Sequence, residues 1–166
     1  MKILVSECLI GAACRYDGKC KPDEKVILLG TEHELVPFCP ENAGGLPTPR
    51  EPSEIRDGRV YTKDGKDVTE SFLSGAEKAW EVFRREHCSC AILKERSPSC
   101  GSRHIYDGSF SGTLISGEGM TCRKIRQMGG RVYSEENLDQ LLQIEYKGKG
   151  SAGSRILMKD ELAPEQ

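Results

Sequence analysis

The sequence lacks any long apolar run and any strong excess of one charge. No stretch of its 166 residues approaches the roughly 20 apolar residues that a membrane-spanning helix needs. The N-terminus also lacks the basic-then-apolar pattern of a secretory signal. The formal net charge of −2 argues against a general binder of nucleic acids or other polyanions. These absences indicate a cytoplasmic protein without a membrane partner, and we expect no nucleic-acid partner.

Cysteine, in contrast, is abundant, with 8 residues in the chain. Because no export signal precedes them, we expect these thiols to lie in a reducing cytosol, where structural disulfides are rare. Clustered cysteines in that compartment more often bind metal or perform redox chemistry than form crosslinks. The composition therefore points to a metal or redox site.

Short strand-like runs alternate with longer helical stretches along the chain. The expected strands are 2–6, 34–38, 91–94 and 132–133. The expected helices are 22–29, 70–87 and 121–128, followed by a last one that ends near Ile144. Such alternation predicts right-handed crossovers and a parallel sheet. We therefore expect an α/β fold, a three-layer Rossmann-like domain with a short, mostly parallel sheet and helices on both faces.

The chain has the length of one ordinary domain, and its composition changes near the C-terminal end. We expect one α/β domain over 1–145 and a polar tail over 146–166. Within the domain, 107–119 is rich in Gly and Ser and is expected to be a loop. Asp64-Gly65, between 59–62 and 66–68, predicts a small hairpin or a tight turn.

Three cysteines lie at the exits of expected strands. Cys8, Cys39 and Cys100 follow the first, second and third strands, each in a loop rich in Gly, Pro and small polar residues. In an open parallel sheet the carboxyl ends of the strands line one crevice, where ligands bind. Three thiolates that converge there indicate a metal or iron–sulfur site, and a set of three leaves one metal position open for substrate.

Cys14 leaves other functions open. With the three cysteines at the strand ends it would provide four thiolates, the number in a closed structural zinc site or a fully ligated cluster. We expect Cys88 and Cys90, at the start of a strand, to pack in the core rather than to bind a metal together. The alternative functions are a zinc-binding structural or interaction module with four Cys ligands and a thiol-redox or sulfur-carrier protein.

Motifs from several parts of the chain occur together. They are SECLIG at 6–11 with CRYDG at 14–18, CPE at 39–41 with GGLPTPR at 44–50, LK at 93–94 with SPSCGS at 97–102, and IYDGSFSG at 105–112. In this order they resemble the signature of the thiouracil desulfidases, a bacterial family long catalogued as a domain of unknown function. The resemblance runs from residue 2 to about residue 142 and so covers nearly the whole domain.

The resemblance implies a [4Fe-4S] cluster held by Cys8, Cys39 and Cys100. Its fourth iron would take the sulfur of a thiolated uracil or of its nucleotide, and water would replace that sulfur without net redox change. The implied partners are this thiolated pyrimidine or nucleotide and the iron–sulfur assembly machinery. Some members of the family carry Val at the position of Cys14, so the resemblance also implies that Cys14 is not a ligand.

Glu41, two residues past Cys39, is placed to activate water for attack on the substrate carbon. The family pairs this Glu with a serine of the SPSC motif. Either Ser97 or Ser99 could relay a proton or stabilise developing charge, and both are candidates. The alternative for Glu41 is a structural role as the cap of a loop amide or of a helix N-terminus.

Four further residues in or beside the motifs are candidates for substrate binding. Arg15 and Arg103 could hold a nucleotide phosphate, and Asp17 and Ser102 lie close to them in the sequence. The charged residues among them could instead form a structural network of ion pairs.

Overall fold

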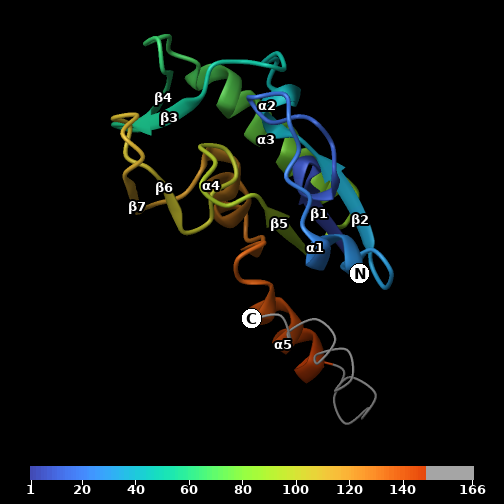
Figure 1. Cartoon of the computed structure of the whole chain (residues 1–166). Helices are drawn as coiled ribbons and strands as arrows, with labels where there is room; N and C mark the ends of the chain where they lie inside the picture. The colour runs from blue at the N-terminus through green and yellow to red at the C-terminus, as the bar shows by residue number, and fades with distance from the viewer. Residues whose placement is uncertain (149–166) are drawn as a thin grey trace.

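The computed structural model describes residues 1–148. Its centre is a sheet of four strands in the order β2-β1-β5-β8, and every neighbouring pair is parallel (Figure 1). The strands are β1 (Lys2–Ser6), β2 (Glu34–Phe38), β5 (Cys90–Leu93) and β8 (Val132–Ser134). After β2 the chain crosses back over β1 to reach β5, so the strand order reverses between β1 and β5. In open α/β sheets, ligands bind beyond the carboxyl ends of the strands at such a point.

Helices cover both faces of the sheet, so its central strands are buried on both sides. The helices are α1 (Glu24–Leu29), α2 (Pro40–Ala43), α3 (Thr69–Arg85), α4 (Met120–Gln127) and α5 (Leu138–Gly148). Along β1, Ile3 and Val5 pack against α1 and α5, whereas Leu4 packs on the opposite face against α3 and α4. The predicted three-layer α/β fold with a mostly parallel sheet is therefore confirmed.

Two antiparallel hairpins form a smaller unit beside the sheet, called the small lobe below. The strands of the small lobe are β3 (Ser53–Arg56), β4 (Arg59–Thr62), β6 (His104–Tyr106) and β7 (Leu114–Ser116). The two hairpins meet where β3 lies against β6, and they share an apolar core with α3. In Figure 1 the small lobe occupies the upper left of the molecule.

The tight turn expected at Asp64-Gly65 is present, and the residues on its two sides pair: the backbone N–H of Thr62 donates to the Lys66 carbonyl at 2.8 Å, and that of Val68 donates to the Val60 carbonyl at 2.9 Å. The main partner of β4 is β3, which is joined to it by Asp57-Gly58. Both turn residues have positive φ, as the type I′ turn that matches strand twist requires. The residues after Asp64-Gly65 add an antiparallel bridge to β4, between Tyr61 and Asp67.

The stretch 107–119, which its composition predicts to be a loop, contains β7. Pairing with β6 gives this strand its hydrogen bonds, although its three residues are all exposed. A short exposed strand of this kind has no alternation of buried and exposed residues from which it could be recognised.

The end of the described chain is helical. The last helix, α5, continues to Gly148, past the expected domain end at residue 145. The remainder of the expected polar tail, 149–166, lies outside the described residues. Among residues 1–148, no helix combines the length and the apolar character needed to cross a membrane.

A close approach between two glycines holds α2 against α3. A Cβ added at Gly75 would lie 2.0 Å from the Pro40 carbonyl oxygen, and one added at Gly44 would meet the backbone of α3 at the same 2.0 Å. Only residues without a side chain allow backbones to come this close. Because α2 begins directly after Cys39 and carries Glu41, the contact between α2 and α3 sets the position of both residues.

Replacing Gly75 by Ala is expected to lower the free energy of unfolding by about 1–3 kcal/mol or more, because the new methyl group overlaps the Pro40 carbonyl. Urea denaturation measures the change. Ser74→Ala, at the exposed neighbouring position, is the control and should change stability by less than about 0.5 kcal/mol. A Gly75→Ala protein as stable as the wild type would show that α2 does not depend on this contact.

Candidate active site

A cavity of about 520 Å³ opens between the carboxyl ends of β1, β2 and β5 and the small lobe. Both sides contribute to its lining, with Ser6 and Phe38 from the strand ends and Glu54 and Tyr106 from the small lobe. The cavity therefore lies at the topological switch point of the sheet, where the fold predicts a ligand site.

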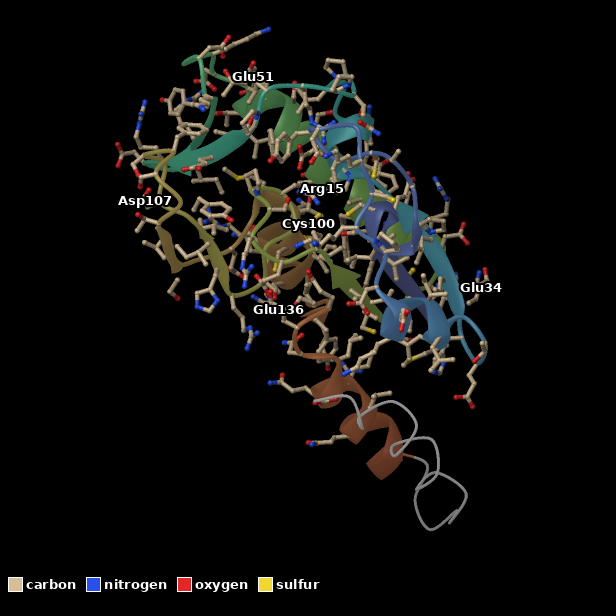
Figure 2. The ribbon with its side chains drawn as sticks, viewed as in Figure 1. Arg15, Glu34, Glu51, Cys100, Asp107 and Glu136 are labelled. Carbon is tan, nitrogen blue, oxygen red and sulfur yellow. The ribbon has the colours of Figure 1, made fainter. Side chains whose placement is uncertain are left out.

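All three cysteines expected at strand ends line this cavity. Cys8 lies in the 3-10 turn η1 (Glu7–Ile10) after β1, Cys39 is the N-cap of α2, and Cys100 lies in the loop after β5. Figure 2 shows Cys100 near the middle of the molecule. Cys14 lines the same cavity and is only 6% exposed, so the structure brings four thiols together rather than three.

The surroundings of Cys14, Cys39 and Cys100 raise the pKa values of these three thiols. Contact with the Cys14 thiol is the main cause that raises the pKa of Cys39 far above its ordinary value, and burial is the second. The Cys39 thiol lowers the pKa of Cys14, but the Cys8 thiol and burial outweigh this effect and raise the pKa to about 11. Burial raises the pKa of Cys100 to about 12. Thiolates in this cavity therefore need a positive partner, and a bound metal supplies one.

Ser6 connects the ends of β1 and β5 beside the cavity. Its hydroxyl donates to the Cys100 sulfur at 3.4 Å and accepts the backbone N–H of Lys94 at 2.9 Å. Ser6 is buried, so these two bonds satisfy a hydroxyl that has little access to water. They fix the direction of the Cys100 side chain at the switch point.

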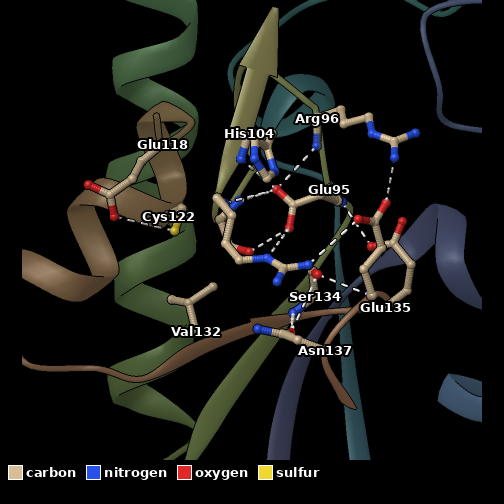
Figure 3. Close-up of polar contacts among 12 residues, drawn as sticks. Glu95, Arg96, His104, Glu118, Cys122, Val132, Ser134, Glu135 and Asn137 are labelled. Atoms are coloured by element: carbon tan, nitrogen blue, oxygen red, sulfur yellow. Dashed lines mark hydrogen bonds and ion pairs between the residues drawn. The ribbon is translucent and has the colours of Figure 1, made fainter. Parts of the chain in front are cut away.

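Glu95 closes the loop that carries Cys100. Its carboxylate is 1% exposed and accepts the backbone N–H groups of Ser102, Arg103 and His104 at 2.8, 3.0 and 3.2 Å (Figure 3). The Ser102 hydroxyl adds a fourth hydrogen bond at 2.7 Å. Burial raises the pKa of Glu95, but these hydrogen bonds outweigh it and lower the pKa to about 2. The ionised carboxylate therefore holds both ends of the loop together.

This role of Glu95 explains where two of the predicted substrate-binding residues lie. Ser102 is buried against the Glu95 carboxylate, and Arg103 is 3.9 Å from the same carboxylate and 3.7 Å from Glu136. Neither residue is among those that line the cavity. The structure thus places Ser102 and Arg103 in the support of the Cys100 loop.

Glu41 lies in the cavity with both of its carboxylate oxygens engaged. Oε1 accepts from Nη2 of Arg50 at 2.9 Å and from Nε at 3.1 Å, and Oε2 accepts from the Ser97 hydroxyl at 3.4 Å. The Ser97 oxygen in turn accepts the backbone N–H groups of Ser99 and Cys100, both at 3.0 Å. A hydrogen-bonded chain therefore connects the Cys100 turn to the Glu41 carboxylate.

The two candidate serines lie on different sides of the loop. Ser97 lines the cavity, whereas the side chain of Ser99 is fully buried and shares a hydrogen bond of 2.9 Å with the Thr121 hydroxyl on α4. The sequence does not show which serine approaches Glu41, because the two serines in SPSC differ only in the direction that the turn gives each side chain. The structure brings Ser97, and not Ser99, to Glu41.

Several cationic side chains complete the lining. Arg15 belongs to it and lies 3.8 Å from Asp17, which is not part of the lining. Lys21 and Lys63 also line the cavity, and within residues 1–148 neither forms an ion pair. The sequence did not identify either lysine as a site residue, since nothing in it distinguishes them from ordinary surface lysines. Only the fold places both at the same cavity.

The fold and the cavity define a class of protein: a doubly wound α/β domain with thiols and an Arg-paired carboxylate gathered at its switch point. The family model described as 2-thiouracil desulfurase matches residues 3–137. The chain therefore belongs to the 2-thiouracil desulfurase family, as its motifs predict.

Two relatives match over almost their whole length. The chain is 45% identical over 150 residues to the Bacillus subtilis (strain 168) protein described as uncharacterized protein YbbK, a match that covers 84% of this chain and 99% of that protein. Among solved structures it is similar to the [4Fe-4S]-dependent thiouracil desulfidase TudS, with a TM-score of 0.82 and 45% identity, over 87% of this chain and 97% of that chain.

Glu95→Gln is expected to destabilise the protein by about 2 kcal/mol or more at pH 7, because an amide N–H₂ would then face the backbone N–H donors. The lowered pKa of Glu95 makes the effect depend on pH. Its stabilisation is complete above the unfolded glutamate pKa of about 4.3 and is lost as the pH falls toward about 2. Urea denaturation at pH 7, 4 and 3 should therefore show that the difference in the free energy of unfolding between wild type and variant becomes smaller as the pH falls. A difference that stays constant with pH would contradict this role.

Proposed function

We propose that this protein is a [4Fe-4S]-dependent enzyme that replaces the sulfur of a thiolated uracil with oxygen. The observation that carries the proposal is the meeting of Cys8, Cys39 and Cys100 with Glu41 in one cavity at the switch point. Membership of the 2-thiouracil desulfurase family and the likeness to TudS support it. The reaction is hydrolytic: the thiocarbonyl compound and water give the carbonyl compound and hydrogen sulfide.

The donor set of the cavity fits an iron–sulfur cluster better than a zinc ion. Thiolates are soft ligands that suit both metals, but a zinc site needs four ligands around one ion. Among residues 1–148, no group of three Cys, His, Asp or Glu side chains is placed to hold a single metal ion. Thiols that share one cavity without converging on a single ion suit a cluster, in which each cysteine binds a different iron.

The thiol-redox alternative has less support. Reactive cysteines of that kind are partly exposed and have a lowered pKa, because the thiolate is the nucleophile. Here Cys100 and Cys14 are buried and their pKa values are raised. We propose that the thiols serve as ligands, that iron–sulfur assembly proteins supply the cluster, and that the enzyme works in the reducing cytoplasm.

Within this proposal Cys8, Cys39 and Cys100 hold the cluster, which supplies a thiophilic Lewis acid that polarises the C=S bond. Glu41 accepts a proton from the attacking water, and the cavity wall excludes other solvent. Arg50 fixes one carboxylate oxygen of Glu41 and leaves the other, beside Ser97, directed to the water. The Ser97 hydroxyl relays this proton: it takes the proton from Glu41 and gives its own to the sulfur as the C–S bond breaks.

The lining also favours a nucleotide over a free base as the substrate. The cavity of about 520 Å³ is in the range that holds drug-sized ligands and is larger than one pyrimidine ring occupies. Arg15, Lys21 and Lys63 supply positive charge that a neutral base does not need and a phosphate does. We therefore propose a thiolated uridine nucleotide such as 4-thio-UMP, with 2- or 4-thiouracil as a weaker substrate.

The test of the function begins with protein purified without oxygen. Iron and acid-labile sulfide analysis should find about four of each per chain, and the protein should be brown. Incubation with 4-thio-UMP should release UMP and sulfide in equal amounts. Colourless protein that contains zinc, or turnover that persists after the iron has been removed, would overturn the proposal.

Serine substitutions are expected to separate ligand cysteines from the rest. Cys8→Ser, Cys39→Ser and Cys100→Ser should each lose most of the iron, whereas Cys88→Ser and Cys90→Ser should keep it. The last two cysteines pack into apolar clusters on opposite faces of the sheet, away from the cavity.

Cys14→Ser decides whether the fourth thiol in the cavity is a ligand. We expect this variant to keep most of its iron and its absorption spectrum. Loss of iron equal to that of Cys8→Ser would show that four cysteines bind the cluster and that no iron position stays open for substrate.

Glu41→Gln is expected to lower turnover by about 100-fold or more, the usual effect of losing a positioned general base. Its iron content should not change, because the carboxylate is not a ligand. Glu51→Gln, at an exposed position outside the cavity lining, is the matched control and should retain full activity. Near-normal turnover by Glu41→Gln would show that another group activates the water.

A further inference from the structure

Phe110 has a backbone conformation that is rare for a large side chain. Its φ is +56°, in the left-handed region, where the Cβ of any residue but glycine crowds the backbone. Such strain persists only where the surrounding structure imposes it, and it is concentrated at functional sites. Phe110 also lines the cavity.

The surroundings that impose this conformation come from the first hairpin of the small lobe. Glu54 on β3 is 9% exposed, and its carboxylate accepts the backbone N–H of Gly108 at 3.0 Å and that of Phe110 at 3.0 Å. A Cβ at Gly108 would lie 2.8 Å from the Ile55 carbonyl oxygen, so the loop and β3 are in direct contact. One buried carboxylate thus fixes the 108–110 segment against the hairpin.

The position of this segment gives the cavity an aromatic side. Tyr106, at the end of β6, lines the cavity together with Phe110, and both come from the small lobe. The thiols and Glu41 come from the opposite side, at the strand ends. A flat ring between the two sides would have its sulfur near the thiols and one face against the aromatic side chains.

We propose that Phe110, supported by Tyr106, is the surface on which the pyrimidine ring of the substrate stacks, and that Glu54 is a positioning residue that holds Phe110 there. This inference rests on the proposed function and adds the recognition of the base to it. Stacking on aromatic side chains suits a planar heteroaromatic ring of any substitution pattern. In this proposal the strained left-handed backbone of Phe110 directs its side-chain ring into the cavity.

The binding test uses UMP, the product, which has no sulfur and does not react. Isothermal titration calorimetry on the iron-loaded protein should show that Phe110→Leu binds UMP about 10- to 100-fold more weakly than the wild type. Tyr61→Leu, an aromatic loss in the same lobe outside the cavity lining, is the control and should bind UMP as the wild type does.

The kinetic test separates binding from chemistry. With the thiopyrimidine that the wild type converts, Phe110→Leu should raise KM by a similar factor and leave kcat and iron content unchanged, because the thiols and Glu41 are untouched. The preference of the wild type for 2-thiouracil over the non-planar 5,6-dihydro-2-thiouracil should also shrink in this variant. An effect on folding alone would not change that preference.

Thermal denaturation tests the strain. Phe110→Gly should melt at a higher temperature than Phe110→Ala, the reverse of the usual order, since glycine adopts φ +56° without crowding. Both variants should bind UMP equally weakly, because both lack the ring. Greater stability of the alanine variant would show that Phe110 is not held in the left-handed region.

The role of Glu54 is tested through Phe110. Glu54→Ala should raise KM, and Glu54→Gln, which keeps an acceptor oxygen, should restore part of the loss. In a Phe110→Ala background, Glu54→Ala should add little, because the residue acts through the ring that is already absent. Fully additive losses would mean that Glu54 contacts the substrate itself.

The outcomes distinguish this inference from the function on which it rests. A wild-type protein that releases no sulfide from 4-thio-UMP or 2-thiouracil overturns both. Normal wild-type turnover together with an unchanged KM and UMP affinity in Phe110→Leu overturns the stacking role alone and leaves the desulfidase function standing.

Discussion

The parallel pairing of β1 with two neighbours is the constraint on which the site depends. Ser6 is in register with Phe38 on β2, and Val5 with Ile92 on β5, so three strands end at the same edge of the sheet. The loops after these strands have to begin next to one another, whatever their sequences. A cavity that combines residues from distant parts of the chain follows from this pairing.

Two buried carboxylates then hold the loops in place. Glu95 organises the loop that carries Cys100, and Glu54 organises the segment that carries Phe110, each by accepting backbone N–H groups. A buried charge is tolerated only when hydrogen bonds replace the water it has lost. Loops without regular structure thereby gain fixed positions on both sides of the cavity. Glu41 differs from both, because its partners are the side chains of Arg50 and Ser97.

The sequence predicted the gathering of Cys8, Cys39 and Cys100 with Glu41 because strand exits follow a general rule of parallel sheets. It left open whether Cys14 would join them, since Cys14 follows no strand and reaches the cavity only through the fold of its loop. The sequence also did not predict where Ser102 and Arg103 lie. Their place beside Cys100 in the motif suggested contact with substrate, but the buried carboxylate of Glu95 draws them to the other side of the loop.

The sequence by itself determined the class of fold, the family and the cysteines at the strand ends. These depend on local apolar periodicity and on contiguous motifs, which can be read along the chain. Tertiary structure alone decided that Ser97 rather than Ser99 meets Glu41, that two lysines turn toward the cavity, and that Phe110 has a left-handed backbone. The physical reason is that each of these depends on the direction of a side chain in an irregular loop. For Ser97 and Phe110, hydrogen bonds to Glu41 and Glu54, far away in the sequence, set that direction.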